Sequence, residues 1–523
     1  MSHHHCHCCA CHDQHPSVTL ELPGVSRRQF LFGVGALTMG GIALSPLEVA
    51  AALEGTAPAH LPRFQQPLKV LPVLTYDIPQ RREATSWRNW GGIQKEADVK
   101  TEQQHIEKEL AVLKSQAEFP IEFLPVACVT NLEQAAAAIK PNYDLLIMYA
   151  AGGGGNILEA MTKTDKWNLM FLRHDSGPVY LWYEIAHNRF LRKTVDEYGQ
   201  PGFDVHDVVV DSQPEILWRL RSLYGLKNAM HKRIVAIGGA GGWGAGGSKA
   251  PANTKSLWKM DLVDFPYAEL APRIKGARND AALVKRCQNA AQQYLRQSGV
   301  TLHTTREFVN NAFVLCEVFK DLMDEARTDA LTINSCMGTI MPMSETTACL
   351  PLSLLNDDGY LAFCESDFVV IPSGVLLHYI SGKPVFLNDP TYPHDKVVTL
   401  AHCTAPRKMD GTHYEKTKIL THFESDYGAA PKVEMKIGQR LTNLVPDFAS
   451  HRWMGFAGTV VGNPFLDICR SQIDVRIDGD GDKLLEEMKG FHWMTCYGDY
   501  RRETGFALKK AGIGWLDVSA PKA

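Results

Sequence analysis

Short apolar runs alternate with segments of helical spacing along much of this 523-residue chain, and this alternation is what most constrains its fold. Leu68–Thr75 is an apolar run of strand length. Thr101–Ala117 then places Ile106, Leu110 and Leu113 on one helical face. Further strand candidates are Ile121–Val129, Leu145–Tyr149, Leu169–Arg173, Val205–Val210 and Arg233–Ile237. Alternation of this kind predicts parallel sheets in α/β layers.

The length of the chain allows two or three domains. After a linker at 53–67, we place an N-terminal α/β domain at 68–230 and a central α/β domain at 231–372. Beyond about residue 430, short strand candidates are separated by Gly, Asn, Pro and Asp. This pattern of short strands and turn residues predicts a β-rich C-terminal domain, which we place at 373–523.

Residues 1–52 have the composition of a leader with a twin-arginine export signal. Ser26–Leu31 reads SRRQFL and leads into Leu31–Leu47, which is too short and too Gly-rich for a convincing membrane span. The small residues of Val49–Ala52 suit cleavage, and an uncleaved N-terminal anchor is the alternative. We expect the twin-arginine machinery to export the protein, folded and carrying any metal, to the periplasm or the medium. After cleavage no stable membrane span is expected.

Cysteine usage falls into two parts. A His/Cys-rich tail, HHHCHCCACH, precedes the export signal and is either a binding site for zinc or copper or a disordered leader. The other cysteines are scattered, several within apolar runs, which indicates buried thiols and not a disulfide framework. The net charge of −4 gives no reason to expect nucleic acid or an anionic membrane as a partner.

Two acids and a histidine follow three successive apolar runs: Glu365, Asp389 and His402. Between the first two runs, Val375–Ile380 has helical spacing and Gly382 is placed to end the helix. This pattern predicts a βαβ crossover, whose parallel strands meet at one carboxyl edge. We expect the three side chains to bind a divalent cation there, with manganese, magnesium or zinc favoured over copper. The alternative is that each acid caps or solvates its loop.

Three further residues are candidates for the same site. His492, in the sequence GFHW, could supply a fourth donor, although a lone histidine between aromatics is commonly a packed or exposed one. Asp367 and Glu345 are acids that could replace one ligand or act in acid–base catalysis.

Around these residues the chain resembles the L-fucose isomerase and L-arabinose isomerase superfamily. The matching text is CESD at Cys364–Asp367, followed 24 residues after its Glu by LND at Leu387–Asp389. That family places a metal-binding Glu and a metal-binding acid at this separation. The strand that ends at His402 resembles the segment that supplies a histidine ligand in arabinose isomerases. Gly490–His492 resembles the late histidine ligand of the family.

The resemblance implies two Rossmann-like parallel-sheet domains followed by a β-rich domain. It implies an aldose–ketose sugar isomerase that moves a proton through an ene-diolate, using Mn²⁺ or another divalent cation. Glu365 and Asp389 would combine the ligand and acid–base roles, and His402 and His492 would complete the coordination. Because the related enzymes are trimers or hexamers, a homotrimer or homohexamer is expected.

A segment near the start of the N-terminal domain is a candidate for binding the sugar. Residues 86–91 read SWRNWG. We expect Arg88 and Trp90 to contribute, because Trp faces stack on sugar rings and Arg binds hydroxyl groups. A packed turn with a solvent-facing Arg is the alternative.

Two other functions stay open. Arg233–Gly244 contains G-x-G-x-x-G directly after a strand candidate, the pattern of an exported NAD(P)-dependent sugar oxidoreductase. However, Ala245–Pro251 is a poor start for the helix that binds phosphate, and no clear strand presents Asp261, so a Gly-rich loop at a sugar site or domain interface is favoured. A non-catalytic sugar-binding protein of the same fold is the other alternative, and epimerisation or β-elimination could replace isomerisation.

Overall fold

The computed structural model describes residues 64–162, 165–183 and 201–521. The export signal, the His/Cys-rich tail and most of the linker lie outside these residues. The described chain forms two compact units, Gln65–Lys227 and a unit that includes everything from Asn228 onward. Within the described ranges, none of the helices combines the length and apolar character needed to cross a membrane.

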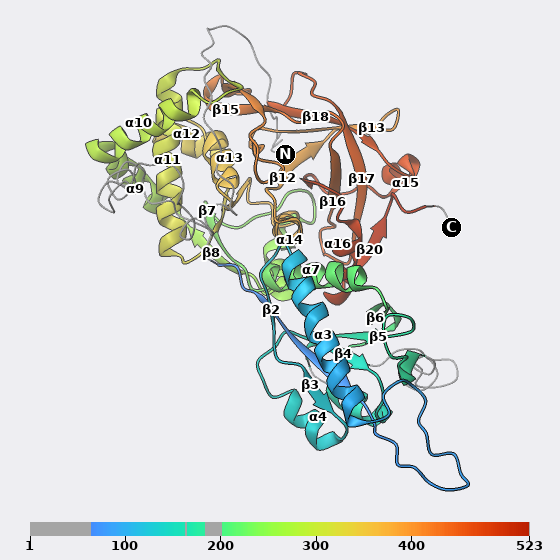
Figure 1. The fold of residues 1–523 in the computed structure, drawn as a ribbon. Coiled ribbons are helices and arrows are strands. Elements are labelled where there is room, and N and C mark those ends of the chain that lie inside the picture. The colour runs from blue at the N-terminus through green and yellow to red at the C-terminus, as the bar shows by residue number, and fades with distance from the viewer. Residues whose placement is uncertain (1–63, 163–164, 184–200, 522–523) are drawn as a thin grey trace, which may run out of the picture. The chain divides into compact units, whose positions relative to one another are not determined.

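The first unit contains a sheet in which every strand pair is parallel (Figure 1). The order is β2-β1-β4-β5-β6, and β3 also pairs with β1. The strands are β1 Leu68–Thr75, β2 Ile121–Phe123, β3 Ala127–Val129, β4 Leu145–Ala150, β5 Trp167–Leu172 and β6 Val208–Val210. The helices are α3 Glu96–Gln116, α4 Leu132–Ala138, α5 Gly155–Thr162 and α7 Gln213–Ala229. Strand β4 is buried throughout, as an apolar run in a parallel sheet should be.

The second unit begins with a four-stranded parallel sheet of order β11-β10-β7-β8. Its strands are β7 Arg233–Ile237, β8 Asp261–Phe265, β10 Ala330–Ile333 and β11 Leu361–Cys364. Its helices are α8 Ala250–Asn253, α9 Tyr267–Asn279, α10 Ala281–Leu295, α11 Arg306–Glu325, α12 Cys336–Ser344, α13 Cys349–Asp357 and α14 Ile371–Ser381. Apolar residues of α9, α11 and α13 form one core with the sheet. The predicted α/β character of both segments is therefore confirmed.

The C-terminal part of this unit is β-rich, as predicted. A seven-stranded sheet has the order β16-β19-β12-β13-β18-β17-β20 and is antiparallel except for the pair β17–β20. Its strands are β12 Phe386–Pro390, β13 Val397–His402, β16 Arg440–Val445, β17 Arg452–Gly462, β18 Ser471–Ile477, β19 Trp493–Tyr497 and β20 Gly514–Asp517. The helices here are α15 Gly481–Glu487 and α16 Arg501–Lys510.

A small third sheet joins the two halves of the second unit. Its order is β15-β14-β9, where β9 is Val300–Leu302, β14 is Lys416–His422 and β15 is Tyr427–Glu434. Strand β9 comes from the segment predicted as a central domain, and β14 and β15 come from the segment predicted as C-terminal. Both predicted segments therefore lie in one compact unit.

The predicted parallel crossover at β11–α14–β12 is wrong. Strand β11 is an edge of the four-stranded parallel sheet, whereas β12 lies antiparallel between β13 and β19 in the seven-stranded sheet. Helix α14 explains the difference, because all of its residues are buried and it contacts both β11 and β19. A helix that is apolar on every side passes between layers and does not cover one face of a sheet. Gly382 does end this helix, with a φ of 65°.

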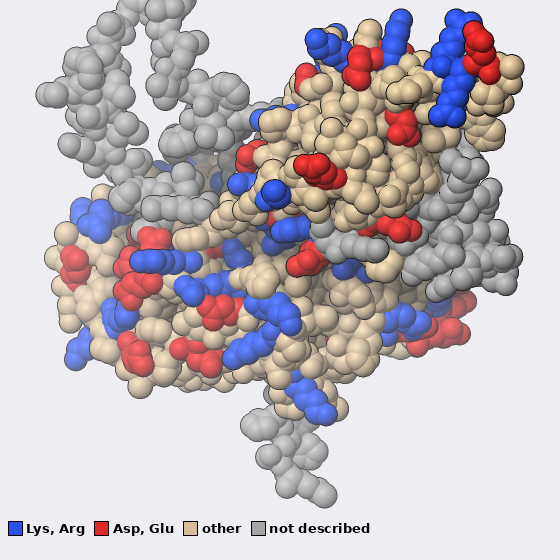
Figure 2. All heavy atoms as spheres, turned by 90° about the horizontal axis from the view of Figure 1, so that it is seen from below, with Lys and Arg blue, Asp and Glu red and all other residues tan. Residues whose placement is uncertain are grey.

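The surface carries charges of both signs. On the face drawn in Figure 2, Lys and Arg side chains are mingled with Asp and Glu side chains. A mixed surface of this kind is typical of globular proteins in general.

Candidate metal centre

The structure brings Glu365, Asp389, His402 and His492 together in the second unit. The Nε2 atom of His492 lies 3.2 Å from Oδ1 of Asp389 and 3.4 Å from Oε2 of Glu365. The Nε2 atom of His402 lies 3.7 Å from Oε1 of Glu365. Asp389 and the two histidines each offer a donor atom within 4.8 Å of the others. These residues form a possible metal-binding cluster.

Three neighbouring strands supply three of the four side chains. Asp389 stands on β12, which has β13 on one side and β19 on the other. His402 is the last residue of β13, and His492 directly precedes β19. The strand registers pair Asp389 with Ala401 and Asn388 with Trp493. Asp389, His402 and His492 therefore lie at neighbouring positions across the sheet.

Glu365 reaches this cluster from the other sheet. It follows β11 and has a φ of 64°, and Ser366 after it has a φ of 46°. Positive φ values are uncommon for residues with a Cβ and cost about 1 kcal/mol or more each, so they persist where the surroundings enforce them. The turn places Glu365 where it contacts both histidines.

Each histidine is held through the nitrogen that faces away from the cluster. Nδ1 of His492 and Oδ2 of Asp367 share a hydrogen bond of 2.8 Å. His402 shares one of 2.9 Å between Nδ1 and Oγ1 of Thr404. Because Asp367 can only accept when ionised, it holds a proton of His492 on Nδ1, and Nε2 is the nitrogen that faces the cluster and would bind a cation in place of its own proton.

Asp367 therefore has a different place from the one expected. It is 1% exposed and its Oδ1 accepts the backbone N–H groups of Trp243 and Val369, each at 3.1 Å. Sequence reasoning named it only as a spare ligand or acid–base group, whereas it lies behind His492. Glu345 does not join the cluster: it ends α12 and its carboxylate pairs with Arg278.

Charge in the cluster is balanced between acids and imidazoles. Burial opposes ionisation of Glu365, but its contacts with His402 and His492 outweigh this and hold the pKa of the carboxyl well below its usual range. Burial likewise opposes protonation of His492, yet Asp367, Asp389 and Glu365 raise its pKa well above the ordinary value. The pKa of His402 is also raised, because Glu365 and Asp389 outweigh the effect of burial. A positive charge is thus strongly favoured between these side chains.

The donor atoms fit a divalent cation. Oδ1 of Asp389 and the Nε2 atoms of His402 and His492 are buried, and none makes a hydrogen bond of ordinary geometry with the described residues. A buried polar atom left in this state costs about 1–3 kcal/mol. Two carboxylates and two imidazoles are donors that manganese, magnesium and zinc accept, and a bound cation would satisfy all three atoms.

The Gly-rich loop after β7 forms one wall of the cluster. Trp243, within this loop, stacks on Phe491 with ring centroids 5.1 Å apart and meets His492 edge-on at 6.1 Å. Gly241 forms a backbone bridge with Asp367. The sequence pattern drew attention to the glycines but not to Trp243, whose position in a glycine run was the available signal.

The features that a dinucleotide site requires are poorly met by this loop. The glycines are followed by a short turn at Gly247–Lys249, and the helical segment beyond it, α8 continued by a π-helix at Thr254–Trp258, begins only at Ala250, past the glycines. The expectation that no strand presents Asp261 is wrong, since β8 begins there. Asp261 lies at the start of β8, however, and pairs with Arg233 at 2.6 Å.

Arg88 and Trp90 lie in the first unit, apart in the chain from the four donors. Trp90 is 65% exposed, and the guanidinium of Arg88 lies 5.3 Å from the ring centre of Trp87. Their role in binding sugar stays a prediction.

A comparison of the sequence with known protein families finds no match, and a comparison with curated proteins finds none.

Proposed function

We propose that this chain is a metal-dependent aldose–ketose isomerase, a distant and exported relative of the L-fucose and L-arabinose isomerases. The observation that carries the proposal is the meeting of Glu365, Asp389, His402 and His492, which come from parts of the chain up to 127 residues apart. The resemblance in sequence named the same four residues, and their contacts in the fold support it.

The chemistry needs a base, an acid and a means of polarising the sugar carbonyl. A divalent cation, Mn²⁺ in our proposal, would polarise the carbonyl and neighbouring hydroxyl of an open-chain sugar when held by the four donors. Glu365, a largely buried carboxylate beside both histidines, would accept the proton from the carbon beside the carbonyl. Return of a proton to the neighbouring carbon, with transfer of the hydroxyl proton to the former carbonyl oxygen, completes the reaction. One carbon is oxidised as the other is reduced, so no external oxidant is required.

The surroundings of the four donors suit this role. Asp389 is more exposed than Glu365, with 23% of its side chain accessible against 12%, so it is the acid that substrate can reach more readily. Asp367 fixes the ring of His492. The stacked pair Trp243 and Phe491 offers an apolar face beside the donors, and such faces pack against the C–H groups of sugars.

The test combines metal analysis with NMR of candidate sugars in D₂O. The wild-type chain should bind a divalent cation, interconvert an aldose and its ketose, and exchange deuterium into C2. Glu365→Gln and Asp389→Asn should each lose the Mn²⁺ held by the four donors, and activity with it. Asp474→Asn is the matched control, since Asp474 lies on β18 of the same sheet as Asp389 and bonds Thr399 at 2.7 Å.

The alternatives predict different results in the same experiment. An oxidoreductase predicts bound nicotinamide and a change in its absorbance, and a sugar-binding protein predicts neither turnover nor exchange. Full Mn²⁺ content in both Glu365→Gln and Asp389→Asn would overturn the assignment of the site.

A further inference from the structure

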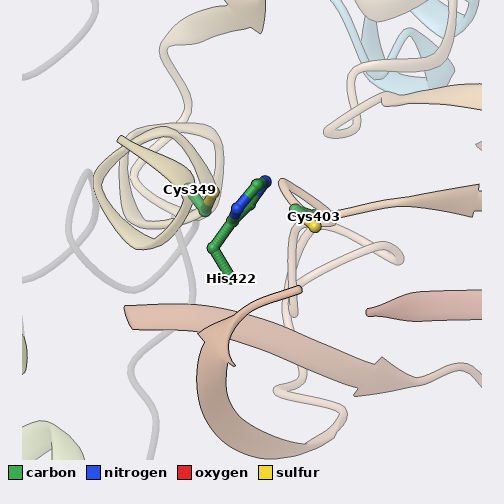
Figure 3. A group of neighbouring side chains, drawn as sticks. All are labelled: Cys349, Cys403 and His422. Carbon is green, nitrogen blue, oxygen red and sulfur yellow. The ribbon is translucent and has the colours of Figure 1, made fainter. Parts of the chain in front are cut away.

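A second cluster of potential ligands lies in the same unit and contains sulfur. Cys349 begins α13, Cys403 directly follows β13, and His422 ends β14. All three are buried, and one donor atom of each lies within 4.8 Å of the others. Figure 3 shows the ring of His422 between the two cysteines, with the three side chains arriving from a helix, a loop and a strand.

A third thiol lies beside this group, next to Cys403. The sulfur of Cys469, which is also buried, lies 3.7 Å from that of Cys403. This is too long for a disulfide, whose sulfurs are about 2.05 Å apart. It matches the separation of two thiolates on one tetrahedral zinc ion, which is about 3.8 Å for Zn–S bonds of about 2.3 Å. We propose that Cys349, Cys403 and His422 form a thiolate–imidazole site for Zn²⁺, which Cys469 would join as the fourth ligand by closing on the other three.

The residues around the cluster support a bound cation. Nδ1 of His422 shares a hydrogen bond of 3.1 Å with the hydroxyl of Ser425, which orients the ring, and Nε2 is the nitrogen through which it would bind the metal. Arg470 is buried and donates to the side chain of Thr421 at 3.0 Å, next to His422 in the chain. Because three thiolates exceed the charge of one zinc ion, the buried guanidinium of Arg470, which follows Cys469 in the chain, would offset part of the remaining negative charge.

Apolar packing alone explains less of this arrangement than zinc binding does. The cysteines do belong to a small apolar core with Ala401 and Ala430, and a buried thiol can act simply as a small hydrophobic group. A core built for packing gives no reason for an imidazole between two thiols, because burying that polar group has a cost. Zinc ligation accounts for all four side chains together.

The zinc site would brace the first cluster. Cys403 follows His402 in the chain, so a metal held by Cys403 would fix the end of β13 from which His402 reaches the first cluster. The donor chemistry of the two sites would also separate their metals, since thiolates favour zinc and oxygen donors favour manganese or magnesium. This inference rests on its own residues and stands whether or not the protein isomerises sugars.

The test measures zinc per chain and the absorption spectrum with cobalt(II) in the full-length protein whose tail cysteines, Cys6, Cys8, Cys9 and Cys11, are replaced by Ser, and this background serves as the wild type. We expect one tightly held zinc ion and, with cobalt, a thiolate-to-metal charge-transfer band and the visible bands of a tetrahedral site. Cys349→Ala and His422→Gln should lose the zinc and the band, because each removes a ligand. Neither residue belongs to the first cluster, so these variants report on the zinc site alone. Cys316→Ala, a buried cysteine of α11, is the matched control and should keep both.

Two results would overturn the zinc site. One is a cobalt spectrum of the wild-type chain without a thiolate band, which needs no variant to fold. The other is unchanged zinc content in Cys349→Ala and His422→Gln. The band should persist in Asp389→Asn, where the first cluster is disrupted, and its loss there would likewise contradict a separate site.

Discussion

The replacement Asp367→Asn tests how the cluster of four donors is organised. In the wild type, Oδ1 of Asp367 accepts two backbone N–H groups, from Trp243 and Val369, and Oδ2 accepts Nδ1 of His492. Asparagine can keep the first two bonds with its oxygen, but its NH₂ group then faces Nδ1. A donor there requires Nδ1 to accept, which moves the ring proton of His492 to Nε2, where a metal would bind.

The magnitude follows from the bond that is lost. Turning the amide around would instead place its NH₂ group against two backbone N–H donors, so the first arrangement is preferred. The substitution thus removes one charge-assisted hydrogen bond, worth about 1.5–3 kcal/mol. Loss of a carboxylate behind a histidine ligand typically lowers metal affinity by about 10–100-fold, or about 1.4–2.7 kcal/mol.

The assay is competition between the protein and a chelator for Mn²⁺, with Asp357→Asn as the matched control. Asp357 is also buried, and its Oδ1 accepts the backbone N–H groups of Arg407 and Lys408 at 2.7 Å each. Its replacement should leave Mn²⁺ affinity within about 2-fold, because asparagine keeps these bonds and none of them is made to a donor of the cluster. Equal affinity of Asp367→Asn and wild type, or an equal loss in the control, would refute the role given to Asp367.

Three further outcomes are expected. Mn²⁺ at about 100 times its Kd should raise the free energy of unfolding by about 2.7 kcal/mol in the wild type but not in Asp389→Asn, as measured by urea unfolding. Burial lowers the pKa of Lys432 to about 8, so the folded chain binds fewer protons than the unfolded chain between that pH and about 10.5. Stability should therefore rise across this interval by up to about 3 kcal/mol, and the rise should vanish in Lys432→Met; a parallel pH profile for the two proteins would contradict this. Replacing both Arg27 and Arg28 with Lys should keep the protein in the cytoplasm on cell fractionation, and continued export would exclude the twin-arginine route.

Local sequence patterns predicted many elements of the fold because their causes are local. The spacing of Ile106, Leu110 and Leu113 indicated a helix, and all three are buried on α3. The apolar run at β4 is buried on both faces, as parallel sheets require. Gly382 ends α14 because a residue without a Cβ adopts positive φ at little cost.

The pairing of strands could not be predicted in the same way. The sequence from β11 to β12 has the form of a crossover, yet β12 pairs antiparallel with β13 and β19. The choice depends on partners more than 100 residues away, at Trp493–Tyr497. Only the absence of charge from α14 indicated locally that this helix would be buried on every side.

The sequence by itself determined which side chains can bind a cation, since the donor chemistry of Glu365, Asp389, His402 and His492 belongs to the residues. Tertiary structure decided how they meet: two different sheets deliver them, and the expected shared edge of one sheet does not exist. It also placed Asp367 behind His492 and gathered Cys349, Cys403, Cys469 and His422. Contacts of this kind depend on the packing of distant segments, which no short stretch of sequence encodes.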